Sequence, residues 1–172
     1  MRVTRAKLAL LLAFSVVGLI ASAYVIWTWY IERQQLLFCR PGQMLGPFEL
    51  DCARVLGSSY STVLGVPLEF LALAYFIVNL FLVWTYAFGS DRMASRAFRA
   101  LFAWRFLGII LVPYLMFVEL VLLHAICIYC TTMHATIIID FVVITYLLFW
   151  RDESALPIEG EGLAIPADPG HG

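Results

Sequence analysis

Four cysteines, arranged in two pairs, are the residues of this chain whose types and spacing most clearly indicate chemistry. Cys127 and Cys130 form a Cys-x-x-Cys motif inside a long apolar stretch, while Cys39 and Cys52 lie in the longest polar stretch with twelve residues between them. At a helix start, residues three apart share one face, close enough for a disulfide, and the helix N-terminus favours the reactive thiolate. The two pairs therefore predict thiol–disulfide exchange.

A Cys-x-x-Cys motif has other interpretations, and the sequence weakens most of them. Covalent haem attachment requires a histidine directly after the second cysteine, where this chain has Thr131. Structural zinc sites usually place about two to four residues between paired cysteines, far fewer than separate Cys39 from Cys52. No iron–sulfur spacing is present, so we expect no metal. The remaining alternative is a pair of inert bridges that only stabilise the fold.

The composition indicates a membrane protein. Of 172 residues, 63% are hydrophobic and 13% are charged, whereas a soluble domain has about 25% charged residues. The formal net charge of -1 offers no basic face to a nucleic acid. We therefore expect the lipid bilayer, and no nucleic acid, among the partners.

Four apolar segments are long enough to cross the hydrocarbon core, which needs about 20 helical residues. The first is too long for the core of a signal peptide and ends in aromatic residues typical of a membrane interface. The sequence thus predicts an all-α membrane protein, with a four-transmembrane-helix bundle over residues 1–151 and a disordered acidic cytoplasmic tail over residues 152–172. The expected helices are Leu8–Tyr30, Pro67–Phe88, Ala100–Leu123 and Ile126–Trp150.

The basic residues predict the orientation of these helices. With four spans, eight of the 11 lysines and arginines fall on one side, if Arg105 snorkels back to that side. Under the positive-inside rule this is a multi-pass protein of the plasma membrane with both termini in the cytoplasm and all four cysteines on the outer, oxidising face. The eight residues are Arg2, Arg5, Lys7, Arg92, Arg96, Arg99, Arg105 and Arg151.

The outer loop, Ile31–Val66, is too long to be wholly irregular. Apolar residues recur at helical spacing after Asp51, so we expect a short helix that lies in the membrane interface and caps the bundle. The residues that carry this spacing are Val55, Leu56, Tyr60, Val63 and Leu64.

Three acidic residues interrupt the apolar segments. Asp140 falls near mid-bilayer, where an ionisable group is a functional candidate by default; it could carry protons, or be a neutral carboxyl bonded to Tyr75, Thr85 or a similar group. Glu69 and Glu119 fall near the outer ends of the second and third helices. Both could border a bound head group or simply reach the interface.

A resemblance to the vitamin K epoxide reductase family is carried by two stretches: Cys52–Ser61 followed by Gly65-Val66-Pro67, and Cys127-Ile128-Tyr129-Cys130-Thr131-Thr132. These features in this order are more specific than any one of them alone. Prokaryotic members, which act like the DsbB proteins, reoxidise a thioredoxin-like (DsbA-like) partner and pass electrons to a quinone. The resemblance therefore implies a separate thioredoxin-like partner and a quinone acceptor of the menaquinone or ubiquinone type.

The resemblance also implies residue roles. Cys127 and Cys130 match the active-site pair, with Cys130 nearer the quinone, and Cys39 and Cys52 match the loop pair that receives electrons from the partner. Ser58 matches a serine or threonine that hydrogen-bonds the quinone.

The chain also departs from the animal enzymes at the quinone pocket. Leu68 or Glu69 stands where they have an asparagine, and His134 where they have a tyrosine. His134 could bond a quinone oxygen, pass its proton, or simply bond a neighbouring helix. His124, three residues before Cys127, could favour its thiolate or merely lie at the interface.

Two rival functions stay open from the sequence. The first is a reductase of the same family whose main substrate is vitamin K quinone or its epoxide. The second is a non-catalytic membrane scaffold held by two stable disulfides.

Overall fold

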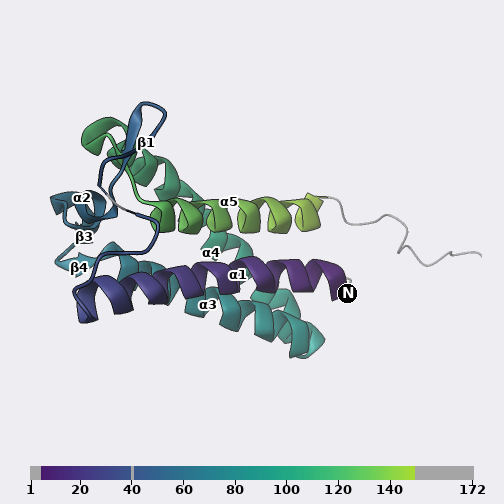
Figure 1. Ribbon diagram of the computed structural model, residues 1–172. Coiled ribbons are helices and arrows are strands. Elements are labelled where there is room, and N and C mark those ends of the chain that lie inside the picture. The colour runs from purple at the N-terminus through teal and green to yellow at the C-terminus, as the bar shows by residue number, and fades with distance from the viewer. Residues whose placement is uncertain (1–4, 40, 150–172) are drawn as a thin grey trace, which may run out of the picture.

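The computed structural model describes the backbone of residues 5–39 and 41–149. Four long helices lie side by side (Figure 1), and each is long and apolar enough to cross a membrane. The predicted all-α bundle of four transmembrane helices is therefore confirmed, while the tail expected at 152–172 lies outside the described residues. The helices are α1 (Arg5–Val25), α3 (Leu68–Phe88), α4 (Asp91–Phe117) and α5 (Ile128–Phe149).

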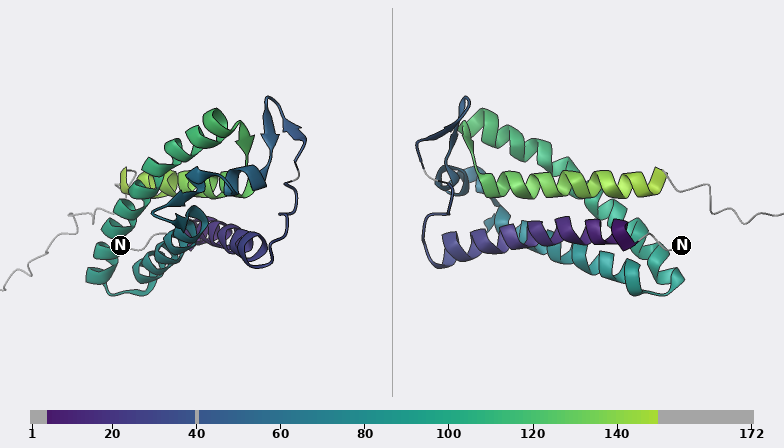
Figure 2. Two further views of the ribbon diagram at one scale, coloured as in Figure 1. Left: turned by 90° about the vertical axis from the view of Figure 1, so that its left-hand side faces the viewer. Right: turned by 45° about the vertical axis from the view of Figure 1, so that its right-hand side comes forward.

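The chain passes up and down the bundle in sequence order. α1 and α4 each pack against both α3 and α5, so the four helices form a ring, which Figure 2 shows from two further directions. The long connection between α1 and α3 lies at one end of the bundle, together with the start of α5 (Figure 1). We call this the loop end, and the opposite end, where α1 begins, the terminal end. All four cysteines lie at the loop end, as expected, although the membrane face it occupies stays a prediction.

The starts of α4 and α3 differ from the expected ones. α4 begins at Asp91 rather than Ala100, because Ser90 opens the helix and accepts a 2.8 Å hydrogen bond from the Ala94 N–H. Arg92, Arg96 and Arg99 are therefore on helical turns, not in a connection. Pro67 was expected in the first turn of its helix but precedes α3 in extended conformation.

Two helices continue into π-helical turns at the loop end. α1 is followed by η1 (Ile26–Ile31) and α4 by η3 (Val118–Leu123). Short π-helical segments are rare and often found at functional sites. Here they rotate the residues that follow relative to a regular helix.

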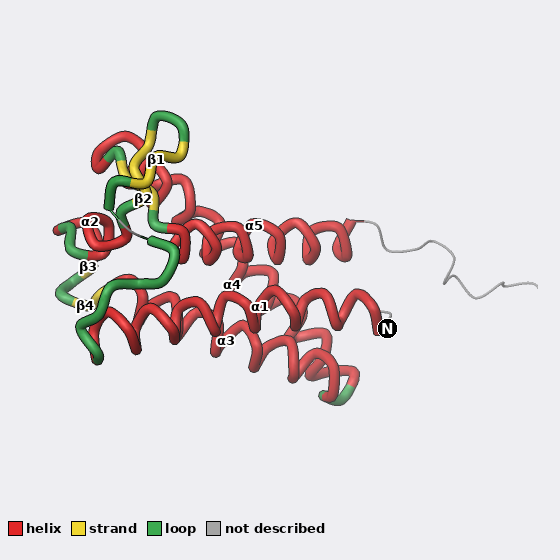
Figure 3. Tube along the Cα trace, viewed as in Figure 1, coloured by secondary structure: helices red, strands yellow, loops and turns green. Residues whose placement is uncertain are grey.

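Short strands and helical turns cover the loop end (Figure 3). β2 lies between β1 and β5 in one small sheet, and β3 pairs with β4 in another. β2 pairs with β5 in parallel, with Leu50 opposite Ile126. The elements are β1 (Gln43–Leu45), β2 (Phe48–Leu50), α2 (Cys52–Leu56), η2 (Ser59–Ser61), β3 (Thr62–Val63), β4 (Val66–Pro67) and β5 (Ala125–Ile126).

The expected short helix is present but shorter than the apolar spacing suggested. α2 ends at Leu56, with Val55 and Leu56 buried beneath it. Tyr60 falls in the 3-10 turn η2, and Val63 and Leu64 in the β3–β4 hairpin, where all three are exposed. Gly57 ends the helix, because its N–H bonds back to the Ala53 carbonyl at 2.9 Å and the chain then leaves helical geometry.

The interior of the bundle is layered along its length. Apolar side chains and the four cysteines form a buried core at the loop end. A second apolar core, made of Leu11, Val83, Leu101 and Ile144, lies toward the terminal end. Between the two cores lies a polar layer, defined as Ser15, Asn79, Arg105 and Asp140, with one residue from each long helix and no exposed surface.

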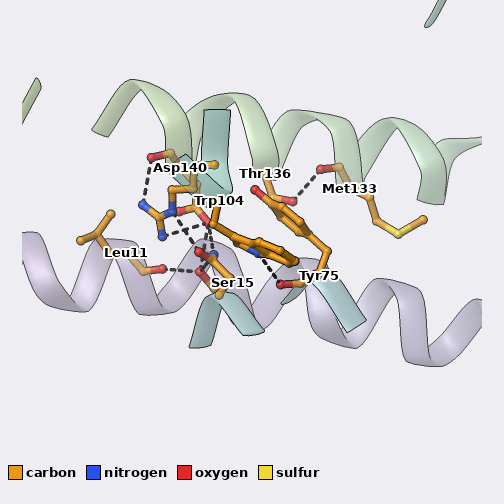
Figure 4. A network of polar contacts seen from close by, with 9 residues as sticks. Leu11, Ser15, Tyr75, Trp104, Met133, Thr136 and Asp140 are labelled. Carbon is orange, nitrogen blue, oxygen red and sulfur yellow. Dashed lines mark hydrogen bonds and ion pairs between the residues drawn. The ribbon is translucent and has the colours of Figure 1, made fainter. Parts of the chain in front are cut away.

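The polar layer corrects the expectation for Arg105 and identifies the partners of Asp140. Arg105 was expected to snorkel to the terminal end, yet it is fully buried and its Nη2 lies 3.5 Å from Asp140 Oδ2. Its Nε also donates to Asn79 Oδ1 at 3.0 Å. Asp140 is bound by Arg105, Asn79 and Ser15, so its polar partners on neighbouring helices are residues other than Tyr75 and Thr85. Figure 4 shows Ser15 and Asp140 facing each other across the bundle. A buried charge needs such partners.

Candidate active site

The loop pair is joined as a disulfide. Cys39 and Cys52 are bonded, with their Cα atoms 5.7 Å apart, and both are buried. Cys52 is the first residue of α2, whose N-terminus is capped by Asp51 through a 3.0 Å bond from the Arg54 N–H to Oδ1. The Cys52 N–H also donates to Cys39 Sγ at 3.0 Å. The capped helix start therefore fixes where this disulfide lies.

The Cys-x-x-Cys pair is buried as two free thiols. Only Cys130 lies within α5, which begins one residue after Cys127 rather than at Ile126. Cys127 instead occupies the position before the helix, where its Sγ accepts the Cys130 N–H at 3.3 Å. The sulfur thus takes the place of an N-capping oxygen.

The two cysteine pairs are brought together by β2 and β5. The parallel register places Leu50 opposite Ile126, and the Asp51 N–H then donates to the Ile126 carbonyl at 3.2 Å. Cys52 and Cys127 follow directly from these paired positions. All four cysteines belong to one buried cluster, so the strand register sets the loop disulfide beside the Cys-x-x-Cys pair.

A cavity of about 360 Å³ lies between the helices at the loop end. Its walls are almost entirely apolar, and Cys130 forms part of them. Three leucines line the cavity and are also exposed on the outside of the bundle: Leu71 of α3 is 43% exposed, and Leu107 and Leu111 of α4 are 51% and 52% exposed. The cavity is therefore bordered, between α3 and α4, by side chains that face the lipid. Its apolar lining also includes Ala72, Tyr75, Trp104, Gly108, Met133 and Ile137.

Two polar pairs border this cavity near Cys130. The Tyr30 hydroxyl, on η1, donates to Glu69 Oε2 at 2.8 Å. In the other pair, His134 Nδ1 lies 3.9 Å from Oε1 of Glu119, a residue of η3. Glu69, Glu119 and His134 are 4%, 6% and 6% exposed, and all three line the cavity. Each π-helical turn thus supplies one member of a buried polar pair.

The predicted quinone-site residues are brought to one place. Ser58, Leu68, Glu69 and His134 all line the cavity that Cys130 borders. The Ser58 hydroxyl donates to the Val55 carbonyl at 2.8 Å, so in this conformation it offers a ligand a lone pair rather than a proton. Their roles toward a quinone stay predictions.

Other expectations about the site had different outcomes. The His124 side chain is exposed, and its backbone is left-handed with φ at 51°, so it forms the turn before β5, while its effect on the Cys127 thiol stays a prediction. Sequence reasoning left Glu119 undecided and did not single out Tyr30. Glu119 could have been weighted more heavily, since a carboxyl in an apolar span is costly to bury. Among the described residues, no group of three or more His, Cys, Asp or Glu side chains is placed to hold a metal ion.

Comparison with known proteins agrees with this geometry. Residues 9–145 match the family model described as "Vitamin K epoxide reductase family". The match spans all four helices, the loop end and both cysteine pairs. A comparison with curated protein sequences gives no significant match. The chain therefore belongs to the vitamin K epoxide reductase family, whose membership implies disulfide and quinone redox chemistry in a membrane.

Proposed function

We propose that this protein reoxidises a thioredoxin-like (DsbA-like) partner and passes the electrons through its two cysteine pairs to a quinone. The observation that carries the proposal is the position of Cys130. Cys130 lines an apolar cavity bordered by lipid-facing residues, and it belongs to the same buried cluster as the loop disulfide. The proposed electron path therefore runs from the loop disulfide to a cavity that borders the lipid.

The cavity suits a quinone. An apolar wall between α3 and α4 accommodates a ring and an isoprenoid tail that continues into the bilayer. Four polar residues that could contact a head group line the same cavity as Cys130: Ser58, Glu69, Glu119 and His134. A bound quinone would supply a two-electron, two-proton acceptor.

The loop pair accepts electrons first. A thiolate of the partner attacks the Cys39–Cys52 disulfide, and a second partner thiolate completes the exchange, so the partner leaves oxidised and both loop cysteines are reduced. We assign Cys39 as the residue whose sulfur the partner thiolate attacks, because Leu37 and Phe38 beside it are exposed and apolar. Both sulfurs are buried, so this attack requires the segment around Cys39 to move outward.

The second transfer follows the strand register. The Cys52 thiolate attacks Cys127 of an oxidised Cys127–Cys130 pair, and Cys130 leaves as a thiolate. Cys39 then attacks Cys52, which restores the loop disulfide and releases Cys127. The pair Cys127 and Cys130 now carries the two electrons, and it returns to a disulfide when it gives them up at the cavity. The β2–β5 pairing supports Cys52, rather than Cys39, as the residue that meets Cys127.

The proposed side of the membrane follows from the basic residues. Arg92, Arg96 and Arg99 all lie at the terminal end, on the first turns of α4. We assign this end to the cytoplasm of a plasma-membrane protein. The loop end then faces the oxidising compartment, where the protein would support disulfide formation.

The proposal is tested with purified protein, a reduced thioredoxin-like protein and a panel of menaquinone- and ubiquinone-type acceptors. Quinol formation is followed by absorbance, and the state of each cysteine by thiol trapping. Cys130→Ala is expected to keep exchange between the partner and the loop pair but to lose quinol formation. Wild-type quinone reduction by Cys130→Ala would refute the assignment.

Two further results would favour the rival functions. Cysteines that do not change state with any partner or quinone would indicate a scaffold. Turnover of vitamin K epoxide that exceeds turnover with every quinone would indicate an epoxide reductase.

A further inference from the structure

Glu119 and His134 form a buried acid–imidazole pair beside the redox cysteines. His134 lies one helical turn after Cys130 on α5, and its Nδ1, 3.9 Å from Glu119 Oε1, is buried without a hydrogen-bond partner among the described residues. The Glu119 carboxyl also interacts with the backbone N–H of Cys127. The pair therefore connects the start of α5 with the cavity wall.

The chemistry at this site needs a route for protons. When Cys127 and Cys130 become a disulfide, two S–H bonds are lost, and two electrons and two protons leave the thiols. A quinone that becomes a quinol takes up the same two electrons and two protons. The thiols are buried, with Cys127 fully inaccessible, and the cavity wall is nearly all apolar. Protons must therefore pass through the few polar groups present.

We propose that Glu119 relays one of these protons to the quinone through His134. The Glu119 carboxylate takes up a proton released by the cysteine pair and passes it from its carboxyl oxygen to His134 Nδ1. The imidazole gives up the proton that it holds on Nε2 to the quinone oxygen, so the ring returns to a neutral tautomer. This inference rests on the proposed function and adds to it a residue and a proton path.

The surroundings distinguish Glu119 from the other buried carboxyls. Glu69 also lines the cavity, but its carboxyl holds a 2.8 Å hydrogen bond from Tyr30. Asp140 does not line the cavity and is bound by Arg105, Asn79 and Ser15. Within the described chain, His134 is the only side chain that contacts Glu119 through a hydrogen bond or ion pair. Glu119 can therefore change its protonation state without breaking a polar network.

The test compares Glu119→Gln with Glu119→Asp, and uses Glu32→Gln as the matched control on an exposed carboxyl. For Glu119→Gln we expect kcat for quinone reduction to fall about 100-fold, with the quinone Kd unchanged, as measured without turnover by quenching of Trp104 fluorescence in the cavity wall. Glu119→Asp is expected to recover part of kcat, because it restores the acid. Glu32→Gln is expected to match wild type.

A double mutant separates a serial path from two independent roles. Because both residues act on one proton, Glu119→Gln/His134→Gln should lose no more kcat than the worse single variant. Three results would each overturn the inference. The losses in kcat could be additive, or the kcat of Glu119→Gln could equal that of Glu32→Gln. The third is a loss that a weaker quinone Kd or a lower melting temperature explains. Failure of the proposed function is recognised separately, because wild-type protein would then reduce no quinone.

Discussion

The molecule buries polar side chains in two places, and the two differ in how completely those side chains are partnered. In the polar layer at mid-bundle, Arg105, Asp140, Asn79 and Ser15 contact one another from four helices. At the cavity, Glu69, Glu119 and His134 each have one polar side-chain partner among the described residues. The layer lies between two apolar cores, whereas the second group borders an open space. Dense pairing indicates a structural role, and sparse pairing beside a cavity indicates chemistry.

The strongest test of this comparison removes a charge from the polar layer. Arg105→Met leaves Asp140 buried without its cation, so we expect a loss of about 3–5 kcal/mol in the free energy of unfolding. The loss is measured by denaturant titration in detergent micelles. Glu119→Gln, which removes a charge from the cavity, is expected to change this free energy far less.

The control removes both charges at once. In Arg105→Met/Asp140→Leu no charge is left unpaired. Asn79 Nδ2, which donates to Ser15 Oγ at 2.7 Å in the wild-type structure, can still make this bond. About half of the lost stability should return. A double variant as unstable as Arg105→Met would mean that the layer stabilises the bundle by something other than charge pairing.

The next test addresses the apolar packing on which the polar layer depends. Gly18 of α1 lies directly against the ring of Phe76 on α3, and a Cβ at this position would overlap that ring. Phe76 is fully buried and cannot move aside, so Gly18→Ala should cost about 1–3 kcal/mol. Thermal unfolding measures the loss. Gly18→Ala/Phe76→Leu, which makes room for the methyl group, should regain part of it, and an equal loss in both would contradict the packing explanation.

The four helices could be predicted from the sequence, and the polar layer could not. A run of about 20 apolar residues has few alternatives to a membrane helix. The position of Arg105 depends instead on which residues of the other three helices lie at the same depth in the bundle and point toward it. Hydropathy and charge counting place an arginine at the nearest interface, and they carry no information about Asn79 and Asp140.

The candidate site divides in the same way. The family resemblance carried by the cysteines and their neighbours brought Ser58, Leu68, Glu69 and His134 into consideration, and all four line the cavity. The pairing of Glu119 with His134 depends on the π-helical turn η3 and on how η3 packs beside α5. Neither has a signal in the sequence. The short extent of α2 was missed because apolar spacing continued past Gly57 into a hairpin.

The smallest expected effect on stability, and a direct test of the cavity, comes from a second glycine. A Cβ on Gly108 of α4 would lie 2.6 Å from the Tyr75 hydroxyl oxygen. The Tyr75 hydroxyl has no hydrogen-bond partner in the described chain, and Tyr75 borders the cavity. The Tyr75 ring, unlike the ring of Phe76, can therefore shift into open space. Gly108→Ala should therefore cost less than about 1 kcal/mol of stability.

The same shift should be visible in substrate binding. Because Tyr75 would move into the cavity, we expect Gly108→Ala to raise the KM for quinone several-fold while leaving exchange between the partner and the loop disulfide unchanged. Gly108→Ala/Tyr75→Phe removes the nearest atom of the overlap and should lower KM part of the way back. A Gly108→Ala variant that loses stability as Gly18→Ala does, with an unchanged KM, would show that this contact belongs to the packed interior rather than to the cavity.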